Sequence, residues 1–205
     1  MTRLTECSTG RRRTATHGFL LLACALTLGC ASADGEVQSA ASLGLPAWVG
    51  EDRRLFADEL DPAALGLSPS SVSRRDPNLW LRAQKAELVA VVSVKTFTLE
   101  STRGGTYRVG LKVEQPLAEP AFADPVVEIS VDPGDPAYGL FKAQDTLLQN
   151  KRFVGFFKRY AAADDQIVRH FYLASESPEI LALVQEAVAL KEVKRPAGAD
   201  AGPTP

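Results

Sequence analysis

Long runs of β-branched and aromatic residues dominate the middle of the chain. Residues 87–99 are dense in valine and threonine, a composition typical of a well-buried strand. Residues 106–114 alternate between apolar and polar side chains, which predicts a second strand with one face in the core. The sequence Ser-Thr-Arg-Gly-Gly lies between them and predicts a turn, so we expect a hairpin. The expected core face comprises Tyr107, Val109, Leu111 and Val113.

Three more segments have the composition of strands. They are residues 126–131, 152–160 and 166–173. The sequence Asp-Pro-Gly-Asp-Pro at 132–136 predicts a loop, and Asp164-Asp165 predicts the turn between the last two strands. Gly110 and Gly155 lie inside strands, where glycine often marks a bend or a bulge.

Helices are expected on both sides of this β-rich region. After it, Ser177 is a predicted N-cap followed by Pro178, and apolar residues recur at helical spacing as far as residue 194. The buried face of this helix should hold Ile180, Leu183, Val184, Ala187 and Val188 and pack on the sheet. Before it, Asp76-Pro77 predicts a short helix over 77–85 that buries Leu79 and Trp80. Residues 51–60 form a less distinct helical pattern with Leu55, Phe56 and Leu60 on one face.

Residues 1–29 have the character of an export signal. Arg3 and residues 11–13 supply positive charge, and residues 18–29 form an uncharged apolar stretch. That stretch falls short of the roughly 18 residues that a spanning helix needs. The arginines also resemble a twin-arginine signal, but Thr14-Ala15-Thr16 follows where a large apolar residue is usual.

The end of the signal offers two cleavage sites. Leu26-Thr27-Leu28-Gly29-Cys30 resembles a bacterial lipobox, which implies cleavage after Gly29 and lipidation of Cys30, with palmitate among the expected acyl groups. Alternatively, Ala31-Ser32-Ala33 suits ordinary signal peptidase, whose cut after Ala33 would release a soluble periplasmic or secreted protein. The first site predicts an anchor in the cell envelope. Because Ala31 rather than aspartate follows Cys30, we expect the outer membrane, facing the periplasm.

These segments divide the chain into a signal peptide (1–29), a lipidated N-terminus with a flexible linker (30–46), one globular domain (47–194) and a disordered tail (195–205). The domain should be α+β, with a β-rich core over 86–174 and the C-terminal helix over 178–194. Over residues 86–190, with the lead-in 148–154, the hydrophobic pattern resembles secreted bacterial envelope lipoproteins with a small OB or netrin-like barrel. The resemblance implies a small antiparallel β-barrel or a curved five-stranded sheet, packed by the C-terminal helix.

Charge and side-chain chemistry exclude several functions. The chain has 23 Lys and Arg against 25 Asp and Glu, and removing residues 1–29 leaves 19 against 24. An acidic exported body argues against nucleic acid as a partner. After cleavage only Cys30 and His170 remain of the cysteines and histidines, so we expect no zinc site, and the chain has no nucleotide motif that would hold a cofactor. His170 is expected to be an ordinary strand histidine, with no catalytic role.

Paired acids occur at Asp58-Glu59 and Asp164-Asp165. Buried pairs can perform acid–base catalysis. Both pairs lie in expected turns or on exposed helix faces, so we interpret them as solvated charges. Asp132 and Asp135 offer oxygens to calcium, but the spacing of an EF-hand is absent and a proline-rich loop is the preferred interpretation.

One basic segment is a candidate binding surface. Lys151, Arg152, Lys158 and Arg159 flank the aromatic residues of the strand at 152–160. Such interleaving occurs on single-strand nucleic-acid surfaces, but alternation assigns Phe153 and Phe157 to the core. The basic residues could instead contact anionic lipid head groups or a peptidoglycan carboxylate.

The sequence therefore favours a non-enzymatic envelope lipoprotein that binds or scaffolds another envelope component. Its expected partners are membrane lipid, through the anchor, and an envelope protein or peptidoglycan. The alternative is a small secreted enzyme or enzyme inhibitor that acts from a cleft built by loops.

Overall fold

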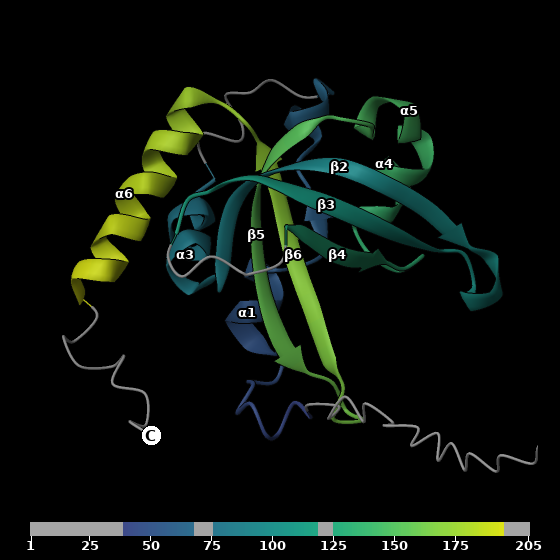
Figure 1. Ribbon diagram of the computed structural model, residues 1–205, viewed down its shortest axis with the longest axis horizontal. Helices are drawn as coiled ribbons and strands as arrows, with labels where there is room; N and C mark the ends of the chain where they lie inside the picture. The colour runs from purple at the N-terminus through teal and green to yellow at the C-terminus, as the bar shows by residue number, and fades with distance from the viewer. Residues whose placement is uncertain (1–38, 68–75, 119–124, 195–205) are drawn as a thin grey trace, which may run out of the picture. The chain divides into compact units, whose positions relative to one another are not determined.

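The computed structural model describes residues 39–67, 76–118 and 125–194, which form one mixed β-sheet with helices (Figure 1). The strand order is β1-β6-β5-β2-β3-β4. Neighbouring strands are antiparallel, except that β1 runs parallel to β6. The fold is α+β, as predicted. The strands are β1 (Glu59–Leu60), β2 (Leu88–Glu100), β3 (Thr106–Pro116), β4 (Val126–Val131), β5 (Arg152–Ala161) and β6 (Ile167–Ser175).

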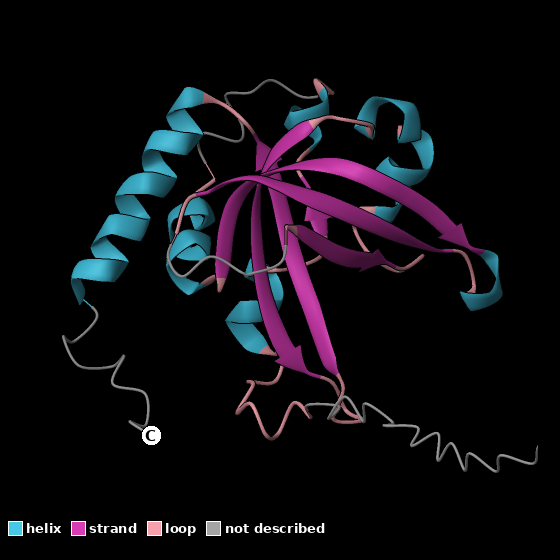
Figure 2. Cartoon of the chain, in the orientation of Figure 1, coloured by secondary structure: helices cyan, strands magenta, loops and turns pink. Residues whose placement is uncertain are grey.

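Helices lie on both sides of the sheet (Figure 2). Figure 1 shows α3 and α6 on one side of the sheet and α4 and α5 on the other. The α-helices are α1 (Gly50–Leu55), α3 (Asn78–Lys85), α4 (Tyr138–Ala143), α5 (Asp145–Leu148) and α6 (Pro178–Lys194), and the 3-10 turns are η1 (Pro62–Leu65) and η2 (Ser101–Arg103).

Strand β5 is buried on both faces because β2 and β6 flank it and helices cover both sides of the sheet. Phe153 and Phe157 pack into one core, which they share with η1, α4 and α5. Phe156 and Tyr160 pack into the other, which they share with α1, α3 and α6. The predicted assignment of Phe153 and Phe157 to the core is confirmed, and these rings are not available to stack on bases.

Helix α6 begins where the sequence predicts. The Ile180 N–H donates to Ser177 Oγ at 3.3 Å, which is the N-cap contact. Four of the five expected core residues are buried and Leu183 is partly buried. Gln84 of α3 donates to the Ala187 carbonyl at 2.9 Å, and Lys191 donates to the Ala86 carbonyl at 2.7 Å. These contacts fix α6 against α3 as well as against the sheet.

The sheet is curved but not closed. The register between β2 and β3 shifts next to Thr96, and the Gly110 N–H donates to the Thr96 hydroxyl at 3.1 Å. A side chain at Gly110 would collide with that hydroxyl, so the glycine permits the irregular pairing. Arg169 of β6 donates to the Glu128 carbonyl of β4 at 2.9 Å. Of the two expected forms, the structure has the curved sheet, since β4 and β6 approach through a side chain and not through the backbone ladder that would close a barrel.

The five predicted strands are present, and the sixth, β1, was not predicted. Helices α4 and α5 were also missed, since elements of 6 and 4 residues are too short to display a helical period. The helix expected over 51–60 ends at Leu55. Trp80 is 36% exposed, so its predicted burial is wrong: α3 packs through Leu79, Arg82 and Ala83 instead.

The start of the described chain is docked on the β5–β6 hairpin. The Ala40 and Ala41 N–H groups donate to the carbonyl and carboxylate of Asp165 at 3.0 and 2.8 Å, and the Ala161 N–H donates to the Pro46 carbonyl at 2.9 Å. Residues 39–46, assigned by sequence to the flexible linker, therefore contact the domain. The predicted signal peptide, the tail and the residues Gly29, Cys30 and Ala33 lie outside the described residues. No helix within the described ranges has the length and apolar character needed to cross a bilayer.

Candidate functional site

The four basic residues predicted as one binding surface lie at two ends of β5. At the end near the β5–β6 turn, Lys158 Nζ lies 2.6 Å from Asp52 Oδ2, and Arg159 Nε lies 2.7 Å from Glu87 Oε2. Lys151 and Arg152 lie at the opposite end, where β5 begins. The structure therefore does not bring the four together, and the two near the turn are engaged in ion pairs.

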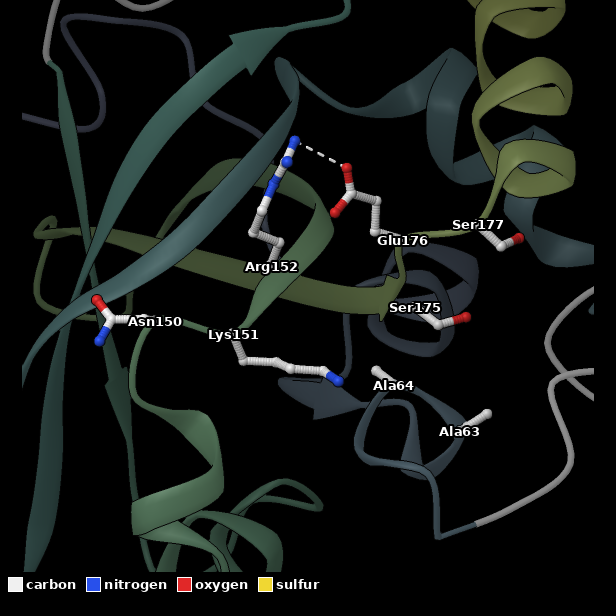
Figure 3. A pocket seen from close by; sticks show the side chains of 8 residues that line it. All are labelled: Ala63, Ala64, Asn150, Lys151, Arg152, Ser175, Glu176 and Ser177. Carbon is white, nitrogen blue, oxygen red and sulfur yellow. Dashed lines mark ion pairs between the residues drawn. The ribbon is translucent and has the colours of Figure 1, made fainter.

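Lys151 and Arg152 line a pocket of about 420 Å³, shown in Figure 3 and named here the Lys151 pocket. Its volume lies within the range of roughly 300–1,000 Å³ that is common for small-molecule sites. The wall comes from η1, from the residues before and at the start of β5, and from the junction of β6 with α6. The lining residues are Ala63, Ala64, Asn150, Lys151, Arg152, Ser175, Glu176 and Ser177.

Local sequence explains why the pocket opens here. Phe153 and Ser175 are the last register pair between β5 and β6, so the two chains separate beyond them. On one side Asn150 has a φ of 60°, a left-handed conformation that asparagine tolerates better than most residues. On the other side Ser177 caps α6 and Pro178 directs the chain into the helix. The pocket lies where the two strands separate, between the left-handed turn at Asn150 and the start of α6.

The charges of the pocket are only partly paired. Arg152 Nη2 lies 2.8 Å from Glu176 Oε1, while Lys151 is exposed and makes no ion pair with the described residues. Figure 3 shows Arg152 directed toward Glu176 and Lys151 extending toward Ala64. The Ser175 Oγ atom is buried and has no hydrogen-bond partner within the described part of the chain. The pocket thus offers a ligand the exposed ammonium group of Lys151, whereas the Ser175 hydroxyl is covered.

A second polar group surrounds His170. Asp58 Oδ2 lies 2.5 Å from His170 Nδ1, and Asp58 Oδ1 accepts the Phe171 N–H at 3.1 Å. The indole of Trp48 stacks on the imidazole with 3.6 Å between ring centroids, and Tyr160 lies against it at 5.6 Å. We name Trp48, Asp58, Tyr160 and His170 the His170 cluster.

Asp58 is 4% exposed, so its assignment as a solvated acid is wrong. Burial raises the pKa of Asp58 above its ordinary value of 3.8, and this effect exceeds the lowering by His170. A buried carboxylate that orients an imidazole is an arrangement found in catalytic sites. Here two aromatic rings cover the imidazole, so the cluster has the character of a structural contact. Asp164 and Asp165 are exposed, as predicted.

Sequence reasoning could not find this cluster, because Asp58 and His170 are 112 residues apart. The one local signal is that the acidic pair Asp58-Glu59 lies between apolar residues in a segment without clear periodicity. Asp132 and Asp135 contact each other through the Asp132 N–H and Asp135 Oδ2 at 2.6 Å. Among the described residues, His, Cys, Asp and Glu form no group with the arrangement of a metal site.

Comparisons with protein families, curated proteins and solved structures found no match to this chain. The chemistry of the two sites therefore rests on their own residues.

Proposed function

We propose that this protein is an exported envelope lipoprotein, anchored through Cys30, whose domain is a non-enzymatic binding module. The observation that carries the binding role is the Lys151 pocket, in which an exposed lysine without an ion pair among the described residues adjoins a buried hydroxyl. Support for the anchor is the lipobox-like sequence that ends at Gly29-Cys30. The expected partner is another envelope protein or peptidoglycan.

The anchor is tested by intact mass and N-terminal analysis of the protein from its native host. The expected product starts at Cys30 and carries acyl chains, and Cys30→Ala should abolish both the acylation and the membrane fraction. A mature chain that starts at Asp34 without lipid would refute the anchor and favour a soluble periplasmic or secreted protein.

The binding role is tested separately by photocross-linking in intact envelopes. A photoreactive amino acid at Lys151 should capture an envelope component, whereas one at Lys142, an exposed lysine of α4, should not. Recovery of no component at Lys151 would count against the binding module even if the lipid were present.

The second candidate function is a small secreted enzyme or enzyme inhibitor. The observation that favours it is the Asp58–His170 contact, which has the geometry of an oriented general base. The Lys151 pocket does not include this pair, and its lining contains one carboxylate, Glu176. A hydrolytic activity that disappears in His170→Gln, while the fold is retained, would establish the enzyme instead.

A further inference from the structure

The lining of the Lys151 pocket carries one more positive charge than negative charge. It includes two cations, Lys151 and Arg152, and one carboxylate, Glu176. Because Arg152 and Glu176 form an ion pair, the excess charge is that of Lys151. An exposed ammonium group on a concave wall attracts an anion and donates to it.

The rest of the lining selects among anions. Ala63 and Ala64 supply methyl groups, and Figure 3 shows the Lys151 side chain extending toward Ala64. An anionic group that meets the ammonium would therefore have its neighbouring atoms against an apolar surface. Glu176 adds a carboxylate that can accept from N–H groups next to the anion. The pocket thus suits an anion attached to a small apolar group that also carries N–H donors.

A doubly charged anion fits this lining less well. Phosphate groups are recognised by several cations or by bidentate arginine, but the Arg152 guanidinium is already engaged by Glu176. Lys151 alone is left to face the anion, so a second negative charge would have no partner in the lining. A single carboxylate matches the excess charge of the pocket.

We propose that the Lys151 pocket binds the free carboxyl end of a short peptide with small apolar side chains. The terminal carboxylate accepts from Lys151 Nζ, and the small side chains lie on Ala63 and Ala64. The peptide N–H groups next to the terminal carboxylate donate to Glu176. This inference rests on the proposed binding function and specifies the chemical class of its ligand.

The test is isothermal titration calorimetry of the full chain in detergent with N-acetyl-alanyl-alanine and with the same peptide as its C-terminal amide. The acid should bind and the amide should bind at least about tenfold more weakly, because the contact to a charged group is lost. Lys151→Gln should weaken binding of the acid by a similar factor. Lys142→Gln removes the same charge from an exposed lysine outside the pocket and should leave binding unchanged.

Glu176→Gln should have the opposite effect on the affinity for the acid from Lys151→Gln. It removes the negative charge that competes for the cations, keeps an acceptor oxygen for the peptide N–H groups and releases Arg152, so the acid should bind several-fold more tightly and inorganic phosphate should begin to compete. Equal binding of acid and amide, no binding of the acid at millimolar concentration, or full binding by Lys151→Gln would each overturn the proposal.

Free alanine and a cell-wall peptide fragment, titrated in parallel, distinguish a free amino acid from a peptide end as the source of the carboxylate. Tight binding of alanine alone would replace the peptide by an amino acid and overturn the peptide assignment. If the peptide does not bind, acylation of Cys30 and cross-linking at Lys151 can still be observed. The peptide proposal and the proposed function can therefore fail independently.

Discussion

The Asp58 carboxylate lies 2.5 Å from Nδ1 of His170 and joins the segment after α1 to β6. Its other oxygen accepts the Phe171 N–H, and the backbone N–H of Asp58 donates to the Phe171 carbonyl at 3.0 Å. Asp58 adopts a φ of 54°, so the chain turns there and enters β1. The Asp58 side chain therefore adds two contacts to the backbone hydrogen bonds that hold the parallel edge strand on β6.

Replacing Asp58 by alanine should destabilise the protein by about 2 to 4 kcal/mol, because His170 and the Phe171 N–H lose their acceptor and alanine tolerates the left-handed conformation poorly. Asp58→Asn keeps the size, an acceptor for Phe171 and tolerance of positive φ, so it should cost much less. Urea unfolding at pH 7 measures both. Equal stability of the two variants would show that the side-chain contacts are not what fixes β1.

The ionisation of Asp58 predicts a fall in stability as pH rises. Burial raises the pKa of Asp58 in the folded protein above 3.8, the ordinary value, so the folded state holds this proton to higher pH than the unfolded chain does. The stabilisation by this proton is fully present below pH 3.8 and is lost as pH rises through the folded pKa.

The asparagine in Asp58→Asn cannot ionise, so the stability of this variant should not fall with pH for that reason. Urea unfolding from pH 3.5 to 7 should therefore show the wild type losing stability relative to Asp58→Asn as pH increases. Burial also raises the pKa values of Glu59 and Asp135. Glu59 cancels in the comparison, whereas the charge of Asp58 contributes to the raised pKa of Asp135, so its removal in Asp58→Asn adds to a difference of the same sign. A difference that does not change with pH would contradict the raised pKa.

Gly155 is required by the ring of Phe157. A Cβ atom at Gly155 would lie 2.5 Å from Phe157 Cε2, in the middle of the sheet where neither side can move freely. Gly155→Ala should therefore destabilise the protein by about 1 to 3 kcal/mol. Gly139 in α4 has open space around it, so Gly139→Ala should stabilise by about 0.5 to 1 kcal/mol through helix propensity. Thermal unfolding followed by circular dichroism should show a lower melting temperature for Gly155→Ala and a higher one for Gly139→Ala.

Arg82 connects three parts of the structure from a buried position. Its Nε donates to the Leu55 carbonyl at 2.7 Å, it pairs with Asp76, and its guanidinium lies 3.5 Å from the ring centroid of Tyr172. A lysine ammonium cannot serve these partners together, so Arg82→Lys should cost about 1.5 to 3 kcal/mol.

The matched control for Arg82→Lys is Arg54→Lys, at an exposed position of α1, which should change stability by less than about 0.5 kcal/mol. Denaturant unfolding of both variants tests the assignment. A negligible effect of Arg82→Lys would mean that packing alone positions α3.

Local sequence determined much of this domain. Alternation at Tyr107, Val109 and Leu111 and the dense apolar run of β5 specified strands, because side chains on a strand point alternately to its two faces. Ser177-Pro178 specified the start of α6, since a helix end must satisfy its own N–H groups locally. The export signal and Cys30 are likewise sequence features, and they remain predictions.

Only the tertiary structure decided how these elements meet. The two residues of β1 carry no periodicity, and they form a strand because the edge of β6 offers unpaired backbone groups. The Lys151 pocket combines η1, the start of β5 and the start of α6, which lie far apart in the chain. Asp58 became a buried acid only because His170 and Phe171 lie beside it. Hydrophobic periodicity tells which face of an element is buried, but the partner across the sheet depends on long-range pairing that no local pattern encodes.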